Sequence, residues 1–331
     1  MNPPRCDGLD YIQFLIAAQR VFTCTEAARC QPEAEDAPAH DAFARLLQRS
    51  PPDTEALWQE AEDVVRLEEG VLVLDDTTLD KPYARRMELV TYHWSGKHRR
   101  VVRGINLITL LWTDGEARVP CDFRVYDKPL GGSTKNEHFR EMLMRARERG
   151  FRPSTVLFDS WYSSLDNLKL LRSHGWRWLT RLKGNRLVNP DRSGNVPVSE
   201  VAIPPKGRVV HLKAYGMIRV FRSSSRDGEA EHWATDDMEM REEEQEALSS
   251  QGWGIEDYHR GVKQCCGIER AQVRGAWAQL NHLAYSIRAF IRLEVHRLRR
   301  GISWYEAKAS IIREAIRAYL AKPIFTLNPT A

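Results

Sequence analysis

The sequence lacks cysteines in any spacing that binds a metal. Its six cysteines include no Cys-x-x-Cys motif, and no paired histidines could complete a zinc site. We therefore expect reduced thiols that mostly fill the core, and we exclude a structural zinc site.

Long apolar runs are also missing. No run approaches about 18 apolar residues, and the segment Met1-Asn-Pro-Pro-Arg-Cys6 lacks the apolar core of a signal peptide. We therefore expect a cytoplasmic protein that does not bind membranes. There is no internal repeat and no long low-complexity linker. With 331 residues, 42% hydrophobic and 28% charged, the composition is typical of a soluble globular protein with one large domain or two ordinary ones.

A large excess of charge of either sign is likewise absent. The net charge of +4 would not by itself indicate a nucleic-acid partner. The charges are distributed unevenly, however, with acids at Glu55–Glu69 and Arg241–Glu246 and arginines concentrated after residue 260. This asymmetry is typical of a surface that faces a polyanion, and also of solvated helix faces.

The first part of the chain, residues 1–69, is predicted to be helical. Apolar residues recur at helical spacing from Tyr11 to Phe22, and two short helical segments follow, at 25–30 and 39–49. These two segments are compatible with a helix-turn-helix that presents Arg45 to DNA, and equally with a helical cap that has a polar outer surface.

Residues 70–182 change to an α/β pattern. Three strands are predicted at 71–78, 102–111 and 118–126, followed by a helix at 135–150, a strand at 155–160, a helix at 165–174 and a strand at 178–182. Consecutive strands with short loops imply antiparallel pairing, and the later helical crossovers imply parallel additions. We therefore expect a mixed sheet flanked by helices.

Two further regions complete the predicted organisation. Residues 183–237 are rich in Gly, Pro, Ser and β-formers, which indicates a small β-rich insertion. Residues 238–331 are predicted to be helical, beginning with one long charged helix from Met238 to Gln264. A capping box, Ser303-Trp-Tyr-Glu306, opens the last helix.

Acidic residues follow two of the predicted strands. Asp75-Asp76 and Asp159 lie at carboxyl ends of strands, the edge of an α/β sheet where ligands usually bind. A carboxylate that ends a buried strand is costly unless it is solvated, paired or bound to metal. A single such acid is usually a turn residue, so the functional interpretation depends on there being two of them and a third acid.

The third acid is Glu256, in Trp253-Gly-Ile-Glu-Asp-Tyr-His-Arg-Gly-Val-Lys-Gln264. On a helix, Glu256, Arg260 and Lys263 share one face. Spacing alone would favour an exposed ladder of charges, so the motif has to be judged together with the two acid-bearing strands.

Taken together, these segments resemble the DDE transposases of bacterial insertion sequences, in the branch of insertion sequence families 4 and 701. Three motifs carry the resemblance: Leu74-Asp-Asp-Thr-Thr78, Val156-Leu-Phe-Asp-Ser-Trp-Tyr162, and the helix with six residues between Glu256 and Lys263. The sequence departs from the family pattern at Ser249 and Gly252, where the extended third motif has Tyr and Arg.

The resemblance implies an RNase H-like core interrupted by a β-rich insertion, and a transposase that cuts and joins DNA at the ends of a mobile element. It implies three metal-binding catalytic carboxylates: Asp76, Asp159 and Glu256. Because neighbouring side chains on a strand alternate between faces, Asp75 and Asp76 cannot both reach the metal. Asp76 is favoured for its Asp-Thr-Thr context, and Asp75 is the alternative.

Carboxylates suit Mg²⁺, or Mn²⁺, and two such ions are expected, with no small organic cofactor. The expected partners are the DNA of the element ends and of the target, with a homodimer in the DNA complex of a nucleoid-associated bacterial protein. The residues expected to contact DNA are Trp253, His259, Arg260, Lys263 and Arg45. A metal-dependent nuclease that never joins strands, and a DNA-binding remnant with idle acids, are the alternatives.

Overall fold

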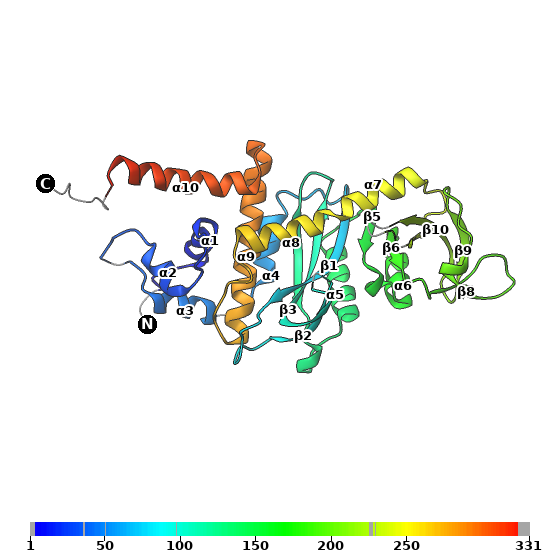
Figure 1. Cartoon of the computed structure of the whole chain (residues 1–331), viewed down its shortest axis with the longest axis horizontal. Coiled ribbons are helices and arrows are strands. Elements are labelled where there is room, and N and C mark those ends of the chain that lie inside the picture. Colours follow the sequence, from blue (N-terminus) through cyan, green and yellow to red (C-terminus); the bar gives the residue numbers. More distant parts are fainter. Residues whose placement is uncertain are drawn as a thin grey trace. The chain divides into compact units, whose positions relative to one another are not determined.

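The computed structural model describes residues 4–35, 37–49, 51–96, 98–224, 228 and 230–323. The chain forms two compact units, one from residues 1–53 with 260–331 and the other from residues 54–259 (Figure 1). In the described part of the chain, no helix is both long and apolar enough to cross a membrane.

The first unit is helical. Its elements are α1 (Gly8–Ala17), α2 (Cys24–Arg29), α3 (His40–Arg49), the end of α8 (Gly254–Cys265), α9 (Ala276–Arg300) and α10 (Trp304–Ala321). The long helix α9 buries an almost continuous stripe and contacts α1, α3 and α10. Tyr11 of α1 bonds the buried ring of His282 at 3.0 Å, which ties the N-terminal segment to α9.

The helices α2 and α3 pack on one another, at the positions where the sequence predicts two short helices. Ten residues separate the end of α2 from the start of α3, whereas a helix-turn-helix joins its helices by a turn of about three or four residues. The connection is longer than that turn, and both the helix-turn-helix and the helical cap stay predictions for this pair.

The second unit is built on a mixed sheet. The strands β1 (Val71–Asp80), β3 (Arg100–Thr113) and β4 (Val119–Val125) pair antiparallel, whereas β5 (Thr155–Phe158) and β6 (Trp178–Leu182) run parallel to β1. The order is β4-β3-β1-β5-β6, with β1 in the centre. This confirms the mixed sheet that the alternation of short loops and helical crossovers predicts.

The β-rich segment after β6 does not form a separate sheet. Its strands are β7 (Leu187–Asn189), β8 (Val196–Pro197), β9 (Arg208–Leu212), β10 (Gly216–Ser224) and β11 (Ala230–Thr235). Because β11 pairs antiparallel with β6, these strands extend the central sheet, which with β2 (Thr91–Ser95) reaches eleven strands among the described residues.

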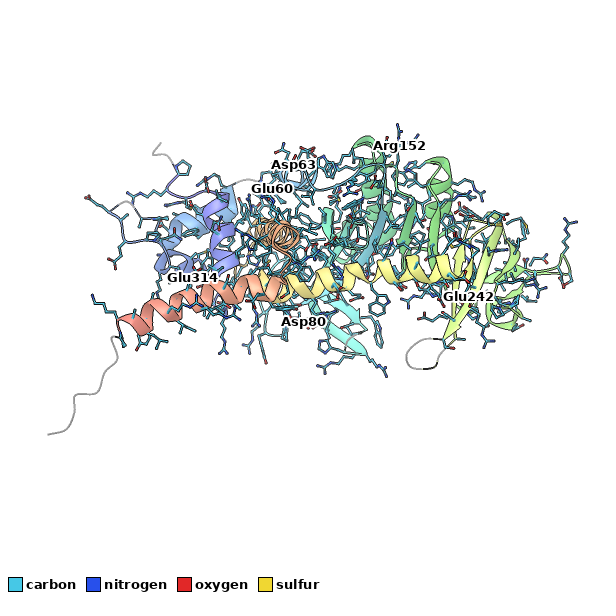
Figure 2. All side chains as sticks on the ribbon, turned by 90° about the horizontal axis from the view of Figure 1, so that it is seen from above. Glu60, Asp63, Asp80, Arg152, Glu242 and Glu314 are labelled. Atoms are coloured by element: carbon cyan, nitrogen blue, oxygen red, sulfur yellow. The ribbon has the colours of Figure 1, made fainter. Side chains whose placement is uncertain are left out.

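Helices cover both faces of this sheet. On one face lie α5 (Lys135–Glu148), which contacts β3 and β4, and α6 (Leu165–Ser173), which packs on α5; α4 (Thr54–Ala61) packs on β4. On the other face α7 (Glu242–Gly252) contacts β5 and β6. Figure 2 shows α7 beginning at Glu242 and running across the strands. Three short 3-10 helices, η1 (Lys128–Leu130), η2 (Ser160–Tyr162) and η3 (Val198–Glu200), lie in connections.

The predicted single helix from Met238 to Gln264 is wrong in one respect. The chain forms two helices, α7 and α8, that are interrupted at Trp253. Glycines flank the interruption at positions 252 and 254, and each lowers helix stability by about 1 kcal/mol relative to alanine. The break places the start of α8 immediately before Glu256.

Candidate active site

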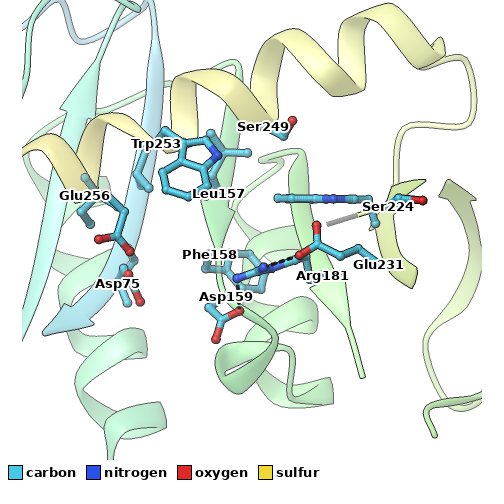
Figure 3. Close-up of a pocket in the computed structure, with 15 residues that line it drawn as sticks. Asp75, Leu157, Phe158, Asp159, Arg181, Ser224, Glu231, Ser249, Trp253 and Glu256 are labelled. Carbon is cyan, nitrogen blue, oxygen red and sulfur yellow. Dashed lines mark hydrogen bonds and ion pairs between the residues drawn. The ribbon is translucent and has the colours of Figure 1, made fainter. Parts of the chain in front are cut away.

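A pocket of about 430 Å³ opens on the α7 face of the sheet. Its floor consists of β1, β5 and β6, and its walls come from β11 and from the α7–α8 break (Figure 3). Three of the acids singled out from the sequence line it, namely Asp75, Asp159 and Glu256. Two more charged residues, Arg181 and Glu231, line it as well.

The register of β1 decides which of the two adjacent aspartates faces the pocket. The strand continues without interruption to Asp80, so side chains alternate strictly through Asp75 and Asp76. Asp75 lines the pocket, whereas the Asp76 carboxylate does not and bonds Lys135 of α5 instead. The structure therefore brings Asp75, the alternative first acid, together with Asp159 and Glu256, and places Asp76 on the opposite face of the sheet.

The Asp76 carboxylate is fully engaged on the α5 face. It accepts hydrogen bonds from Lys135 Nζ at 2.7 Å, Asn106 Nδ2 at 2.7 Å and the Tyr162 hydroxyl at 2.8 Å. Burial alone would raise the pKa of Asp76, but the Lys135 charge and these hydrogen bonds outweigh it and lower the pKa. Asp76 is thus an ionised carboxylate that joins β1 to α5.

The Asp75 carboxyl has the opposite electrostatic environment. It lines the pocket, and its pKa lies well above the ordinary aspartate value. Burial is the largest cause, and the neighbouring carboxylates of Asp76, Asp159 and Glu256 raise the pKa further. Negative charge is therefore concentrated around Asp75, as expected where carboxylates share one site.

Asp159 follows β5 directly, at the start of η2. Its carboxylate accepts a hydrogen bond from Arg181 at 3.1 Å, and the same guanidinium binds Glu231 at 2.8 Å. The Arg181 guanidinium also lies 5.8 Å from the ring centre of Trp233, its neighbour on β11. Arg181 and Glu231 were missed by sequence reasoning, although a charged residue inside the apolar strand Trp178-Leu-Thr-Arg-Leu182 was an available signal.

Glu256 enters the pocket from the first turn of α8. Arg118, after the β3–β4 turn, forms an ion pair with Asp257 at 3.0 Å. This ion pair attaches the first turn of α8 to the sheet. Ser249 and Gly252 also line the pocket. The two positions at which the chain departs from the extended third motif therefore line the same pocket as Glu256.

The residues expected to contact DNA differ in their placement. Trp253 lines the pocket with 58% of its surface exposed, whereas the ring of His259 is buried, with 4% exposed. Arg260 and Lys263 belong to the helical unit, where Lys263 pairs with Glu269 at 3.1 Å. Arg45, also in the helical unit, pairs with Asp41 on its own helix at 2.7 Å.

The donor set of the pocket suits a hard divalent cation. Carboxylate oxygens are the ligands that Mg²⁺ and Mn²⁺ prefer. Within the described residues, no three His, Cys, Asp or Glu side chains are grouped closely enough to hold an ion. The ion pair between Asp159 and Arg181 directs that carboxylate towards β6, so the three acids share the pocket without forming a closed cluster.

Comparison with known proteins gives a family and little further detail. No curated protein matches the chain. A solved structure, the crystal structure of the Mos1 Strand Transfer Complex, matches with 12% identity and a TM-score of 0.21, over 54% of this chain and 58% of that one. The match thus covers less than two thirds of the Mos1 chain, and a likeness this weak supports no argument. The family model of the transposase DDE domain, by contrast, matches residues 66–291, which are well over half of the chain and include Asp75, Asp159 and Glu256. The chain belongs to the family of proteins with a transposase DDE domain.

Proposed function

We propose that this protein is a transposase that cuts DNA at the ends of a mobile element and joins them to a target. The observation that carries the proposal is the meeting of Asp75, Asp159 and Glu256 in one pocket, although more than eighty residues separate each acid from the next along the chain. We assign the first acid to Asp75, because Asp76 points away from the pocket and is held by Lys135. The branch of insertion sequence families 4 and 701 stays a prediction.

The three carboxylates would hold two Mg²⁺ or Mn²⁺ ions. When bound, such ions activate the attacking oxygen and stabilise the leaving oxygen of a phosphodiester. Asp159 would exchange its contact with Arg181 for the ion, and Arg181 would keep its second partner, Glu231.

DNA contacts follow from the same arrangement. Trp253 is exposed beside Glu256 and can stack on a base near the cut. Arg260 and Lys263 are proposed to hold phosphates, and so is Arg45. A mobile element has two ends, so we expect two copies in the DNA complex. We also expect association with the nucleoid.

The test is cleavage and strand transfer on a plasmid that carries the element's own ends. Wild-type protein should cut with Mg²⁺ or Mn²⁺ and not in chelator. Asp75→Asn, Asp159→Asn and Glu256→Gln should each reduce cutting to background. DNA affinity should stay within about threefold, because binding depends mainly on phosphate contacts elsewhere.

Joined products in the same reaction separate a transposase from a nuclease that only cuts. Full cleavage by any of the three variants, or cleavage in chelator, would contradict the carboxylate assignment. Binding of the ends without cleavage by the wild-type chain would instead favour a remnant with idle acids.

A further inference from the structure

The β2–β3 hairpin presents large aromatic side chains to solvent. Tyr92 and Trp94 of β2 are 70% and 68% exposed. The residues that alternate with them, His93 and Ser95, are buried. The cross-strand partners of Tyr92 and Trp94 on β3 are Arg103 and Val101. Aromatic rings exposed to this extent on a paired strand add nothing to the core, so their role has to be sought at the surface.

These aromatic side chains lie on the same face of the sheet as the pocket. Asp75 is paired with Thr109 of β3, so the two side chains lie on the same face of the sheet. Every second side chain along β3 shares that face, and Arg103 is therefore on it as well. Arg103 is paired with Tyr92, so Tyr92 and Trp94 share that face too. Thr109 and Arg103 lie six positions apart on β3, which corresponds to about 20 Å along the strand.

The hairpin lies in a strongly basic part of the chain. Residues 81–103 contain seven Lys or Arg and one acid, Glu88, so their net charge of +6 exceeds the +4 of the whole protein. Arg85, Arg86 and Arg100 are exposed, and so is Tyr83, at 93%. Outside this segment, Asp80 binds the ring of His98 at 3.0 Å. Positive charge interleaved with exposed aromatic rings is the combination that binds nucleic acid.

The opposite face of the hairpin fixes its position. The His93 ring exchanges a hydrogen bond with the Thr91 hydroxyl at 2.7 Å and packs edge-on against Tyr126. Arg103 lies 5.8 Å from the centre of the Tyr92 ring, which orients that ring at the surface. The exposed rings therefore project from a firmly held strand, and little conformational freedom would be lost on stacking.

We propose that this aromatic hairpin, Tyr92, Trp94 and Arg103 with the exposed arginines around them, binds unpaired bases of the DNA strand that runs from the cut site. The inference rests on the proposed function, because it takes the pocket to be the site of cutting. A DNA strand rises about 3.4 Å per nucleotide. The span of about 20 Å along β3 therefore places the stacked bases about six nucleotides from the cut. Duplex binding by the arginines alone would not require the rings.

The experiment compares two labelled DNA probes of the element's end: a blunt duplex, and the same duplex with a single-stranded tail of about ten nucleotides. Affinity is measured by fluorescence anisotropy in chelator, with the full chain. Tyr92→Ser combined with Trp94→Ser should weaken binding of the tailed probe about tenfold or more and that of the blunt probe by less than about twofold. Arg100→Gln should weaken both probes equally and lower the salt slope by about one.

Trp277→Ser is the matched control, because Trp277 is 52% exposed and lies in the helical unit. It should bind both probes like wild type. Unchanged thermal melting would show that the aromatic variant is folded, as its exposed side chains predict. Equal affinity of that variant and wild type for the tailed probe would overturn the proposal. So would a change in its oligomeric state with no change in DNA affinity, which would make the hairpin a protein interface.

These outcomes are separate from a failure of the proposed function. If the wild-type chain does not cut DNA with Mg²⁺, the function fails whatever the aromatic variant does. If it cuts and the aromatic variant binds the tailed probe normally, only the aromatic hairpin proposal fails.

Discussion

Asp75 and Asp76 are neighbours in sequence with opposite surroundings. Asp75 faces two other carboxylates across the pocket, and Asp76 faces a lysine, an asparagine and a tyrosine hydroxyl on the α5 side. A pleated strand places consecutive side chains on opposite faces, so one aspartate is available for metal while the other holds the strand in place.

This division of roles predicts opposite effects of the same substitution. Asp76→Asn removes one partner of an ion pair whose side chains are only 17% and 18% exposed, so the free energy of unfolding should fall by about 2–4 kcal/mol. Cleavage at a temperature where the variant is folded should stay within about tenfold of wild type, because the Asp76 carboxylate does not face the pocket. Urea unfolding and a cleavage assay measure the two quantities.

Asp75→Asn is the matched partner in this comparison. It relieves repulsion among carboxylates, so it should be at least as stable as wild type and yet inactive. A fully folded Asp76→Asn protein that cannot cut, beside an active Asp75→Asn protein, would restore Asp76 as the first acid.

Residue types at the site could be predicted from sequence more readily than their orientations. The strand ends and the helix motif were enough to single out the acids, but choosing between Asp75 and Asp76 required the register of β1 against β3. Arg181 and Glu231 meet only because β11 returns to pair with β6, more than forty residues later. No local pattern contains that pairing.

At the scale of elements, two local signals were available in the sequence and neither was used. Glycines on either side of Trp253 account for the break between α7 and α8. The strand β2 was not predicted, although Thr91-Tyr-His-Trp-Ser95 is rich in β-formers and alternates between exposed and buried positions. Its burial pattern appears only once β3 is beside it.

His93, on the buried side of β2, is expected to make the free energy of unfolding depend on pH. Burial lowers the pKa of His93, and the nearby Lys135 lowers it further, against a smaller opposing effect of Asp76. Stability contributed by the neutral ring is therefore fully present above the unfolded pKa of about 6.5 and is lost as pH falls through the folded pKa. One such group changes the unfolding free energy by at most about 1.4 kcal/mol per pH unit.

Replacing the ring tests this contribution. His93→Gln should flatten the fall in urea midpoint between about pH 7 and 5 without abolishing it, because burial also lowers the pKa values of His174 and His232. The control is His211→Gln, on the exposed side of β9, which should leave the pH profile unchanged. Identical profiles for His93→Gln and wild type would show that this side of the hairpin does not sense pH.

At the scale of the whole molecule, the β-rich segment was predicted as an insertion from its composition, but its attachment was not. Its last strand, β11, pairs with β6 at Thr235↔Leu179 and three further positions. The core strand β6 therefore lies inside the sheet rather than at its edge. Composition predicts strands, whereas the choice of pairing partner depends on which edges the rest of the chain leaves open.

The same pairing predicts that the segment cannot be removed. Replacing residues 183–237 by a short flexible linker deletes β7–β11, leaves β6 as an unpaired edge, and removes Glu231 and Trp233 from the pocket wall. Arg181 would lose one of its two carboxylate partners, and an exposed apolar edge strand promotes aggregation. We expect aggregated protein, or a melting temperature at least about 10 °C lower, measured by circular dichroism.

The control replaces only residues 191–195, the exposed turn between β7 and β8, with a two-residue turn, and should melt within about 3 °C of wild type. A soluble deletion variant that melts like wild type would mean that β6 tolerates being an edge and that the segment is a separable module.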